Sequence, residues 1–336
     1  MIFPEKLNLA NIPTKIIKLC KLSKIYGANI YLKRDDLTGF LTGGNKIRKL
    51  EFFFKDIIQK GCDTVITCGG IQSNHARATA VVARRLGIDP VLILRGDKTS
   101  HYSGNLLIDK ILGAKVITID HQEYKRIDSV LKECSIHLKA DGKRPYIIPE
   151  GGSNGLGSFG YINMMKELKK QMKEMSIEID SIVHAVGSGG TSAGLVIGKK
   201  IYNIKADIYG INVCNDKEYF VKRIYKIIME AKRKYSIDID IKSKELNIID
   251  GYKGLGYAIS RDEEIELIIE IAREEGIIFD PVYTGKAIFG MLDQLNVDKN
   301  RFGENILFIH TGGILGLLTK EKEGKFSQII NSMDNF

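Results

Sequence analysis

The chain has 336 residues, of which 44% are hydrophobic and 27% charged, a balance typical of a globular protein large enough for two domains. No apolar run approaches membrane-spanning length, and residues 1–24 have no continuous apolar core, so we expect a cytoplasmic protein without a membrane partner or a signal peptide. The formal net charge is +9, but the basic residues alternate with acidic ones, which argues against a nucleic-acid partner.

Cysteine and histidine usage points away from disulfides and metals. The chain has 5 cysteines, an odd number, and no Cys-x-x-Cys motif, which fits a reducing compartment. Its 6 histidines include no His-Glu-x-x-His spacing, so no metal site is expected.

Short apolar runs alternate with amphipathic segments along most of the chain. An extended lead-in with a helical piece at 15–26 precedes a strand at 28–33 and a helix from Lys46 to about residue 60. Further strands are expected at 64–68, 91–94, 116–119, 146–148, 181–186, 207–213 and 306–309. Further helices are expected at 74–86, 105–112, 123–138, 161–175, about 194–202, 217–234, 263–275 and 284–295, and residues 235–258 should be irregular. This alternation predicts an α/β fold with mostly parallel strands and crossover connections.

Lys46 is a candidate reactive amine. It follows a Gly-Gly-Asn bend at residues 43–45 and begins a predicted helix, which fixes its position. Burial and the nearby cations Arg48 and Lys49 would both favour its neutral, nucleophilic form. Taken alone, the motif favours a solvated helix start over a reactive amine.

Residues 187–194, Gly-Ser-Gly-Gly-Thr-Ser-Ala-Gly, lie between a predicted strand and a helix. Glycines let backbone N–H groups approach an anion, and a helix N-terminus adds a favourable dipole, so this loop predicts phosphate binding. A tight turn that packs a helix on a sheet is the alternative. The Gly-x-Gly-x-x-Gly pattern at residues 155–160 lacks the acidic residue that a dinucleotide site needs after the next strand, so we interpret it as a connecting loop.

Three further segments follow or precede predicted elements at positions where ligands bind. Residues 69–75, Gly-Gly-Ile-Gln-Ser-Asn-His, follow a strand, as do residues 310–313, His-Thr-Gly-Gly. Residues 280–286, Asp-Pro-Val-Tyr-Thr-Gly-Lys, precede a helix that Thr284 could cap. Each is weak alone, since helix capping would explain much of it.

Two more motifs are Lys-Arg-Asp-Asp at 33–36 and Pro-Glu-Gly-Gly-Ser-Asn at 149–154. With these two and the segments described above, in this order, the sequence resembles the D-cysteine desulfhydrase and 1-aminocyclopropane-1-carboxylate (ACC) deaminase family over nearly the whole chain. The resemblance implies a pyridoxal phosphate (PLP) enzyme of fold type II, with two three-layer α/β domains and the cofactor in the cleft between them. Residues 1–51 plus 160–336 would form the large domain and 52–159 the small one. A homodimer is also implied.

The resemblance also assigns roles to individual residues. Lys46 would form the Schiff base with PLP, and Ser73, Tyr257 and Tyr283 would complete the catalytic set. The cofactor would also be held by Asn74 at its phenolic oxygen, by Thr311 near its ring nitrogen, and at its phosphate by Gly187, Ser188, Gly189, Gly190 and Thr191. The small amino-acid substrate would be bound by Ser73, Asn74, His75, Tyr257, Tyr283 and Thr284.

Three of these positions separate the branches of the family. His75, Thr284 and Thr311 resemble the desulfhydrase branch, whereas ACC deaminases tend to have Gln, Glu and Leu there. A Glu at 284 would carry an acid to the ring nitrogen, whereas Thr284 can offer only a hydroxyl, and a mostly unprotonated ring is a weaker electron sink. We therefore predict β-elimination of D-cysteine to pyruvate, ammonia and hydrogen sulfide. ACC deamination, sulfite elimination from cysteate, racemisation and, from another class, non-catalytic PLP binding remain alternatives.

Overall fold

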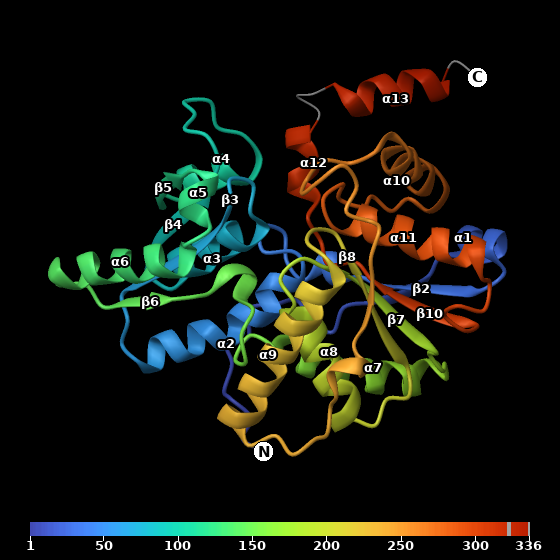
Figure 1. The fold of residues 1–336 in the computed structure, drawn as a ribbon, viewed down its shortest axis with the longest axis horizontal. Coiled ribbons are helices and arrows are strands. Elements are labelled where there is room, and N and C mark those ends of the chain that lie inside the picture. Colours follow the sequence, from blue (N-terminus) through green and yellow to red (C-terminus); the bar gives the residue numbers. More distant parts are fainter. Residues whose placement is uncertain (321–323, 335–336) are drawn as a thin grey trace.

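A computed structural model describes residues 1–320 and 324–334, and within these residues the strands form two separate sheets (Figure 1). The strands are β1 Ile16–Lys18, β2 Asn29–Lys33, β3 Thr64–Gly70, β4 Asp89–Arg95, β5 Lys115–Ile119, β6 Pro145–Ile147, β7 Ser181–Val186, β8 Asp207–Asn212, β9 Asn247–Ile249 and β10 Asn305–Ile309. The α-helices are α1 Cys20–Tyr26, α2 Asn45–Gln59, α3 Asn74–Arg85, α4 Gly104–Ile111, α5 His121–Tyr124, α6 Ile127–Ala140, α7 Phe159–Met175, α8 Gly190–Ile201, α9 Lys217–Tyr235, α10 Asp262–Glu275, α11 Thr284–Val297, α12 Ile314–Lys320 and α13 Lys325–Asp334. Three short 3₁₀ helices are η1 Asp35–Leu37, η2 Glu150–Gly152 and η3 Ser243–Glu245.

The larger sheet has six strands in the order β1-β2-β10-β7-β8-β9. All neighbours are parallel except β1, which pairs antiparallel with β2 through Ile16 opposite Lys33. Successive residues of its buried strands point to opposite faces. Ile182 of β7 packs with α2, α7, α8 and α9, whereas Val183 packs with α1, α10 and α11. Helices thus cover both faces, the three-layer arrangement that buries a parallel sheet.

The smaller sheet has four parallel strands in the order β5-β4-β3-β6, all within residues 64–147. Ile66 and Ile93 pack against Leu131 of α6, and Leu92 and Leu94 pack on the other face with residues of α3 and α4. The predicted α/β class with two mostly parallel sheets is therefore confirmed.

The predicted division at residues 51 and 52 falls inside α2, which runs without interruption from Asn45 to Gln59. This helix packs in one core with β3 and α3 of the smaller sheet and with α7 and α8 of the larger one. Helix α2 therefore packs against elements of both sheets, and its N-terminus lies where they meet (Figure 1).

Several local predictions are wrong. Residues 16–18, expected to be helical, form β1, because the open edge of β2 offers a hydrogen-bonding partner that local sequence does not reveal. The single helix expected at 123–138 is two helices, α5 and α6. The segment expected to be irregular contains η3 and strand β9, which pairs with β8. The loop expected to extend to residue 194 ends earlier, because α8 begins at Gly190.

Among residues 1–320 and 324–334, no helix has the length and apolarity needed to cross a bilayer. The same residues contain no cluster of His, Cys, Asp and Glu side chains suited to a metal ion.

Candidate active site

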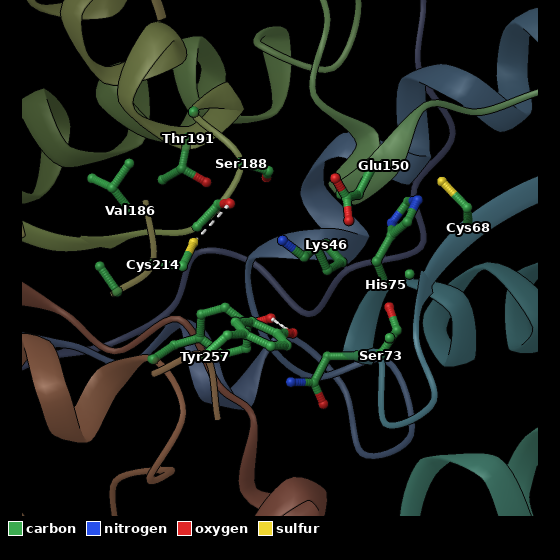
Figure 2. A pocket seen from close by; sticks show the side chains of 18 of the residues that line it. Lys46, Cys68, Ser73, His75, Glu150, Val186, Ser188, Thr191, Cys214 and Tyr257 are labelled. Carbon is green, nitrogen blue, oxygen red and sulfur yellow. Dashed lines mark hydrogen bonds between the residues drawn. The ribbon is translucent and has the colours of Figure 1, made fainter. Parts of the chain in front are cut away.

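A cavity of about 700 Å³ lies between the two sheets, and most of the residues singled out from the sequence line it (Figure 2). Loops that follow the carboxyl ends of β3, β7 and β10 form three of its walls, and the N-terminus of α2 reaches its centre. This is the edge at which open α/β sheets bind ligands.

Lys46 occupies the first turn of α2, and its amine points into the cavity (Figure 2). Burial lowers the pKa of this amine to about 8, although the nearby carboxylate of Glu150 acts in the opposite direction. Arg48, expected from the sequence to assist, instead points away from the cavity and pairs with Asp35 and Glu167. The neutral amine therefore arises from burial, and it is accessible at mildly alkaline pH.

The bend before Lys46 requires glycine. Gly44 has φ +111°, and a Cβ at this position would lie 2.4 Å from the carbonyl oxygen of Thr311. The same carbonyl accepts a hydrogen bond of 3.1 Å from the N–H of Asn45. The bend thus brings the start of α2 directly against the loop after β10, and it holds Lys46 and Thr311 at one site.

The loop after β7 is built to receive an anion. Gly187 and Ser188 lead to Gly189, which has φ +84°, and α8 then begins at Gly190, which does not line the cavity and whose N–H donates to Ser153 at 3.3 Å. Thr191 lines the cavity and accepts a hydrogen bond from the side chain of Asn45 at 3.0 Å. The hydroxyl of Ser192 is buried without a partner among the described residues. Such a donor set suits a phosphate group.

Two cations support this loop, and the sequence did not identify their roles. Lys49, 1% exposed, reaches the carbonyl of Gly151 at 3.2 Å and the hydroxyl of Ser153 at 3.3 Å, and Ser153 in turn contacts Ser188 at 2.8 Å. Burial, and then repulsion from Lys46 and Arg223, place the pKa of Lys49 well below its usual value. An anion in the loop would supply the negative charge that this amine lacks.

Arg223 of α9 lines the same end of the cavity and donates from its Nε to the carbonyl of Ser188 at 3.2 Å. A helix that the sequence marked only as basic thus contributes a cation to the loop. The signal that could have found it is weak, since α9 carries many basic residues and only packing shows which of them faces the cavity.

Ser73 and Asn74 stand where β3 gives way to α3, and both line the cavity. The Ser73 hydroxyl oxygen caps α3 by accepting from the N–H of Ala76 at 3.1 Å, which leaves its proton available to a ligand. The side-chain oxygen of Asn74 accepts from Arg77 and Asn105, so its amide nitrogen is the group that can donate into the cavity. Ser73 thus caps α3, and both residues are potential ligand contacts.

His75 lines the cavity but is 3% exposed and contacts the Thr67 hydroxyl at 2.9 Å. Burial, and then repulsion from Lys46 and Lys49, lower the pKa of His75 well below its usual value. A neutral imidazole anchored to β3 shapes the wall, and it cannot supply charge for a substrate carboxylate.

The two threonines that the resemblance grouped together are separated in the structure. Thr311 lines the cavity, whereas Thr284 is fully buried outside it. The Thr284 hydroxyl donates to Asp280 at 2.7 Å, and the Asp280 carboxylate also accepts from the N–H groups of Val282, Tyr283 and Thr284. The prediction that Thr284 contacts the substrate therefore does not match its position outside the cavity. Thr284 helps to hold the N-terminus of α11, from which Tyr283 projects.

Tyr257 and Tyr283 meet at the cavity wall, with 2.6 Å between their hydroxyl oxygens. Tyr283 precedes α11, and Tyr257 lies on a loop fixed by the buried Lys286, which donates to the carbonyls of Lys253, Gly256 and Ile259 at 2.7–2.9 Å. Burial raises the pKa of Tyr283 well above its usual value. Tyr283 is therefore protonated at physiological pH and can donate a proton or a hydrogen bond.

The wall on the side of the smaller sheet carries groups that the sequence did not indicate. Arg95, the last residue of β4, places its guanidinium 4.7 Å from the ring centre of Tyr124 and 5.4 Å from that of Tyr257. The hydroxyl of Tyr124 donates to Glu150 at 2.5 Å. All four side chains line the cavity.

Comparison with known proteins assigns the chain to a family. The family model described as "Pyridoxal-phosphate dependent enzyme" matches residues 7–312. A Thermotoga maritima protein, "Putative 1-aminocyclopropane-1-carboxylate deaminase", is 45% identical over 319 residues, which cover 94% of this chain and 99% of that protein. The bifunctional mitochondrial D-cysteine desulfhydrase/ACC deaminase of Arabidopsis thaliana is 40% identical over 326 residues, which cover 93% of this chain and 79% of that protein. The chain belongs to the PLP-dependent ACC deaminase/D-cysteine desulfhydrase family.

Solved structures agree. The crystal structure of an ACC deaminase homologue superposes with a TM-score of 0.89 at 38% identity, covering 97% of this chain and 96% of that one. A fungal L-serine ammonia-lyase from Rhizomucor miehei superposes with a TM-score of 0.68 at 15% identity, covering 94% of this chain and 99% of that one, a likeness of fold alone. The protein thus has the fold of a type II PLP enzyme.

The cofactor is pyridoxal phosphate, and the cavity fits it. The loop after β7 offers the donors that a phosphate requires, and the buried amine of Lys49 stands behind this loop without a carboxylate partner among the described residues. The amine of Lys46 lies in the same cavity, with a pKa of about 8 that suits reaction with an aldehyde.

Proposed function

We propose that this family member catalyses the β-elimination of D-cysteine to pyruvate, ammonia and hydrogen sulfide. The observation that carries the proposal is the absence of an acid beside Thr311. Among the described residues that line the cavity, the carboxylates are those of Asp128 and Glu150, and both belong to elements around the smaller sheet. Asp280 is the acid near the loop after β10, and its carboxylate accepts hydrogen bonds from the N–H groups at the N-terminus of α11.

A hydroxyl at Thr311 supports elimination rather than more demanding chemistry. Bound PLP supplies an electron sink for the bond that breaks at the α-carbon, and the strength of that sink depends on protonation of its ring nitrogen. The resemblance places Thr311 near this nitrogen, and a hydroxyl cannot protonate it as a carboxylic acid would. A weak sink is sufficient when a good leaving group such as thiolate departs from the β-carbon.

The remaining roles follow from the chemistry of the side chains. The Lys46 amine, neutral above about pH 8, can accept the α-proton of the substrate. The Ser73 hydroxyl and the Asn74 amide are free to donate toward a carboxylate or a phenolic oxygen. Tyr283, which its raised pKa keeps protonated, can donate a hydrogen bond to the departing sulfur, and Tyr257 contacts its hydroxyl.

ACC deamination to 2-oxobutyrate and ammonia is the second candidate. It is favoured by the relatives, because the Thermotoga maritima protein bears the ACC deaminase name and the Arabidopsis thaliana protein bears both names. The same Lys46 and tyrosine pair would serve it, so the two reactions differ in the demand on the electron sink.

A substrate panel with the PLP-loaded enzyme tests the proposal. D-cysteine, L-cysteine and ACC are supplied in parallel, and sulfide, pyruvate and 2-oxobutyrate are quantified. We expect sulfide and pyruvate in equal amounts from D-cysteine, with kcat/KM at least tenfold above that for ACC. A higher kcat/KM for ACC, or for L-cysteine, would contradict the proposal.

A further inference from the structure

We propose that Arg95 binds the anionic group that leaves from the β-carbon of the substrate. The inference rests on the proposed β-elimination and adds to it a residue that defines the class of leaving group.

Arg95 is held in the cavity wall by two aromatic rings. It ends β4, opposite Gly70 of β3, and its guanidinium lies 4.7 Å from the ring centre of Tyr124 and 5.4 Å from that of Tyr257. Contacts of this kind use the faces of the rings and leave guanidinium N–H groups available for an anion. Arg95 is therefore oriented without being neutralised.

No acid of the described chain pairs with this guanidinium. The neighbouring carboxylate, Glu150, accepts a hydrogen bond from Tyr124 and forms no ion pair with Arg95 within residues 1–320 and 324–334. The buried Arg48 differs in this respect, because it pairs with Asp35 and Glu167. An arginine that faces a cavity without a partner is a site for an anion supplied from outside.

The position of Arg95 relates that anion to the reaction. Tyr257 contacts Arg95 on one side and the hydroxyl of Tyr283 on the other. Tyr283 is the hydrogen-bond donor proposed for the departing group, so the anion site lies next to the place where that group would form. The phosphate loop holds its own cation, Arg223, bound to Ser188, so Arg95 is not needed there.

A cation at such a place would assist the departure of the leaving group. In β-elimination the Cα–H and Cβ–S bonds break. The proton passes to the Lys46 amine, the Cα–H electron pair forms the Cα=Cβ bond, and the Cβ–S pair leaves with sulfur as HS⁻. Water then converts the 2-aminoacrylate product to pyruvate and ammonia. Arg95 would stabilise the charge that develops on sulfur, as oriented donors do where charge develops in a transition state. Substituents that are already anionic, such as sulfonate or phosphate, should bind there too.

Arg95→Gln removes the charge and Arg95→Lys keeps it, with Arg85→Gln on the exposed end of α3 as the matched control. The substrates are D-cysteine and β-chloro-D-alanine, because chloride departs readily without a cation and is neutral while attached. For Arg95→Gln, kcat/KM for D-cysteine should fall about 10- to 100-fold and that for β-chloro-D-alanine less than about 3-fold, the range expected for a lost charge-assisted hydrogen bond. Arg95→Lys should be intermediate, and Arg85→Gln should match the wild type.

Methanesulfonate serves as a probe of the anion site that does not depend on sulfur chemistry. It should inhibit turnover of β-chloro-D-alanine competitively, with an inhibition constant about tenfold weaker in Arg95→Gln and unchanged in Arg85→Gln. Equal losses for both substrates with unchanged inhibition would show that Arg95 only supports Tyr257, and would overturn the inference. A wild-type enzyme that eliminates chloride but not sulfide would overturn the proposed function, and the methanesulfonate constants would then decide the role of Arg95.

Discussion

Helix α2 presents basic side chains to two different surroundings. On the side away from the cavity, Arg48 enters a cluster of fully buried or nearly buried ionic groups. Toward the cavity, the half-buried Lys46 and the buried Lys49 form no ion pair among the described residues. Within one helix, Arg48 thus stabilises the fold through ion pairs, whereas Lys46 and Lys49 remain available to a ligand.

In the buried ionic cluster around Arg48, which we call the frame cluster, each charged group has a partner of opposite charge. The Arg48 guanidinium contacts Asp35 at 2.8 Å and Glu167 at 2.9 Å, Tyr161 donates to Asp35 at 2.7 Å, and the Lys33 amine also pairs with Glu167. Burial by itself would raise the pKa of Asp35, but the Arg48 and Lys33 charges outweigh it and the pKa is lowered. Glu167 behaves in the same way. These carboxylates are charged at neutral pH and leave Arg48 no capacity for a ligand.

The cavity cations show the opposite balance. Burial lowers the pKa of both Lys46 and Lys49, and no carboxylate reverses the shift. The difference teaches that a buried cation is not in itself a mark of function. What distinguishes the two groups is whether the chain itself supplies the counter-charge of the basic side chain. Substitution of basic residues in each environment tests this distinction.

Arg48→Met should have the largest effect on stability. Removing it leaves Asp35 and Glu167 buried without their main partner, a change that costs about 3–5 kcal/mol. Urea unfolding of the cofactor-free protein would measure the loss. A loss below about 1 kcal/mol would contradict the distinction drawn between the two sides of α2.

The same variant should lose part of its acid sensitivity. A carboxyl whose folded pKa is depressed contributes stability above its unfolded pKa of about 4, and the contribution disappears as pH falls through the folded value. The wild type should therefore weaken on acidification below about pH 4 more steeply than Arg48→Met. Parallel slopes would contradict the role assigned to Arg48.

Lys49→Met should affect cofactor binding and not the frame. The free energy of unfolding of the cofactor-free protein should stay the same or rise, because the change removes a buried amine that lacks a counter-charge. The dissociation constant for PLP should increase about 10- to 100-fold, the effect of losing one charge-supported phosphate contact. Titration with PLP, followed by fluorescence quenching, measures it. A strong loss of stability with unchanged PLP affinity would place Lys49 in the frame instead.

Lys60→Gln should have the smallest effect. Lys60 pairs with Asp56 at 2.7 Å one helical turn apart near the exposed end of α2, with 55% of its side chain accessible. Such exposed pairs contribute about 0.3–0.5 kcal/mol. The same urea titration should show a loss within this range, and a loss above about 1.5 kcal/mol would indicate that exposure is not what weakens the pair.

Much of the fold could be predicted because its strands are short apolar runs separated by amphipathic helices. Strand β9 was missed because its three residues, Asn247–Ile249, gain their hydrogen bonds only from β8. Strand β1 was taken for helix for the same reason, since pairing with β2 defines it. Edge strands depend on partners that are distant in sequence, and local patterns do not contain them.

The site was predictable where backbone conformation left a sequence mark. The glycine bend before Lys46 and the loop after β7 carry glycines that their conformations require. Lys49 has no such mark, because its contacts with residues 151 and 153 join segments about 100 residues apart. Arg95 carries a positional signal, because it directly follows the strand predicted at 91–94 and therefore stands at the ligand-binding edge of the sheet.

The central claim is that Lys46 is the amine with which PLP reacts, and titration of PLP into cofactor-free wild type, Lys46→Ala and the exposed-site control Lys132→Ala tests it most directly. Wild type and Lys132→Ala should develop the visible absorbance of covalently bound PLP and form product. The rate at which the wild-type absorbance develops should rise with pH and level off above about pH 8, because the neutral amine reacts and its pKa is lowered to about 8. Lys46→Ala should show neither the absorbance nor turnover at any pH. Full visible absorbance and turnover in Lys46→Ala would contradict the account.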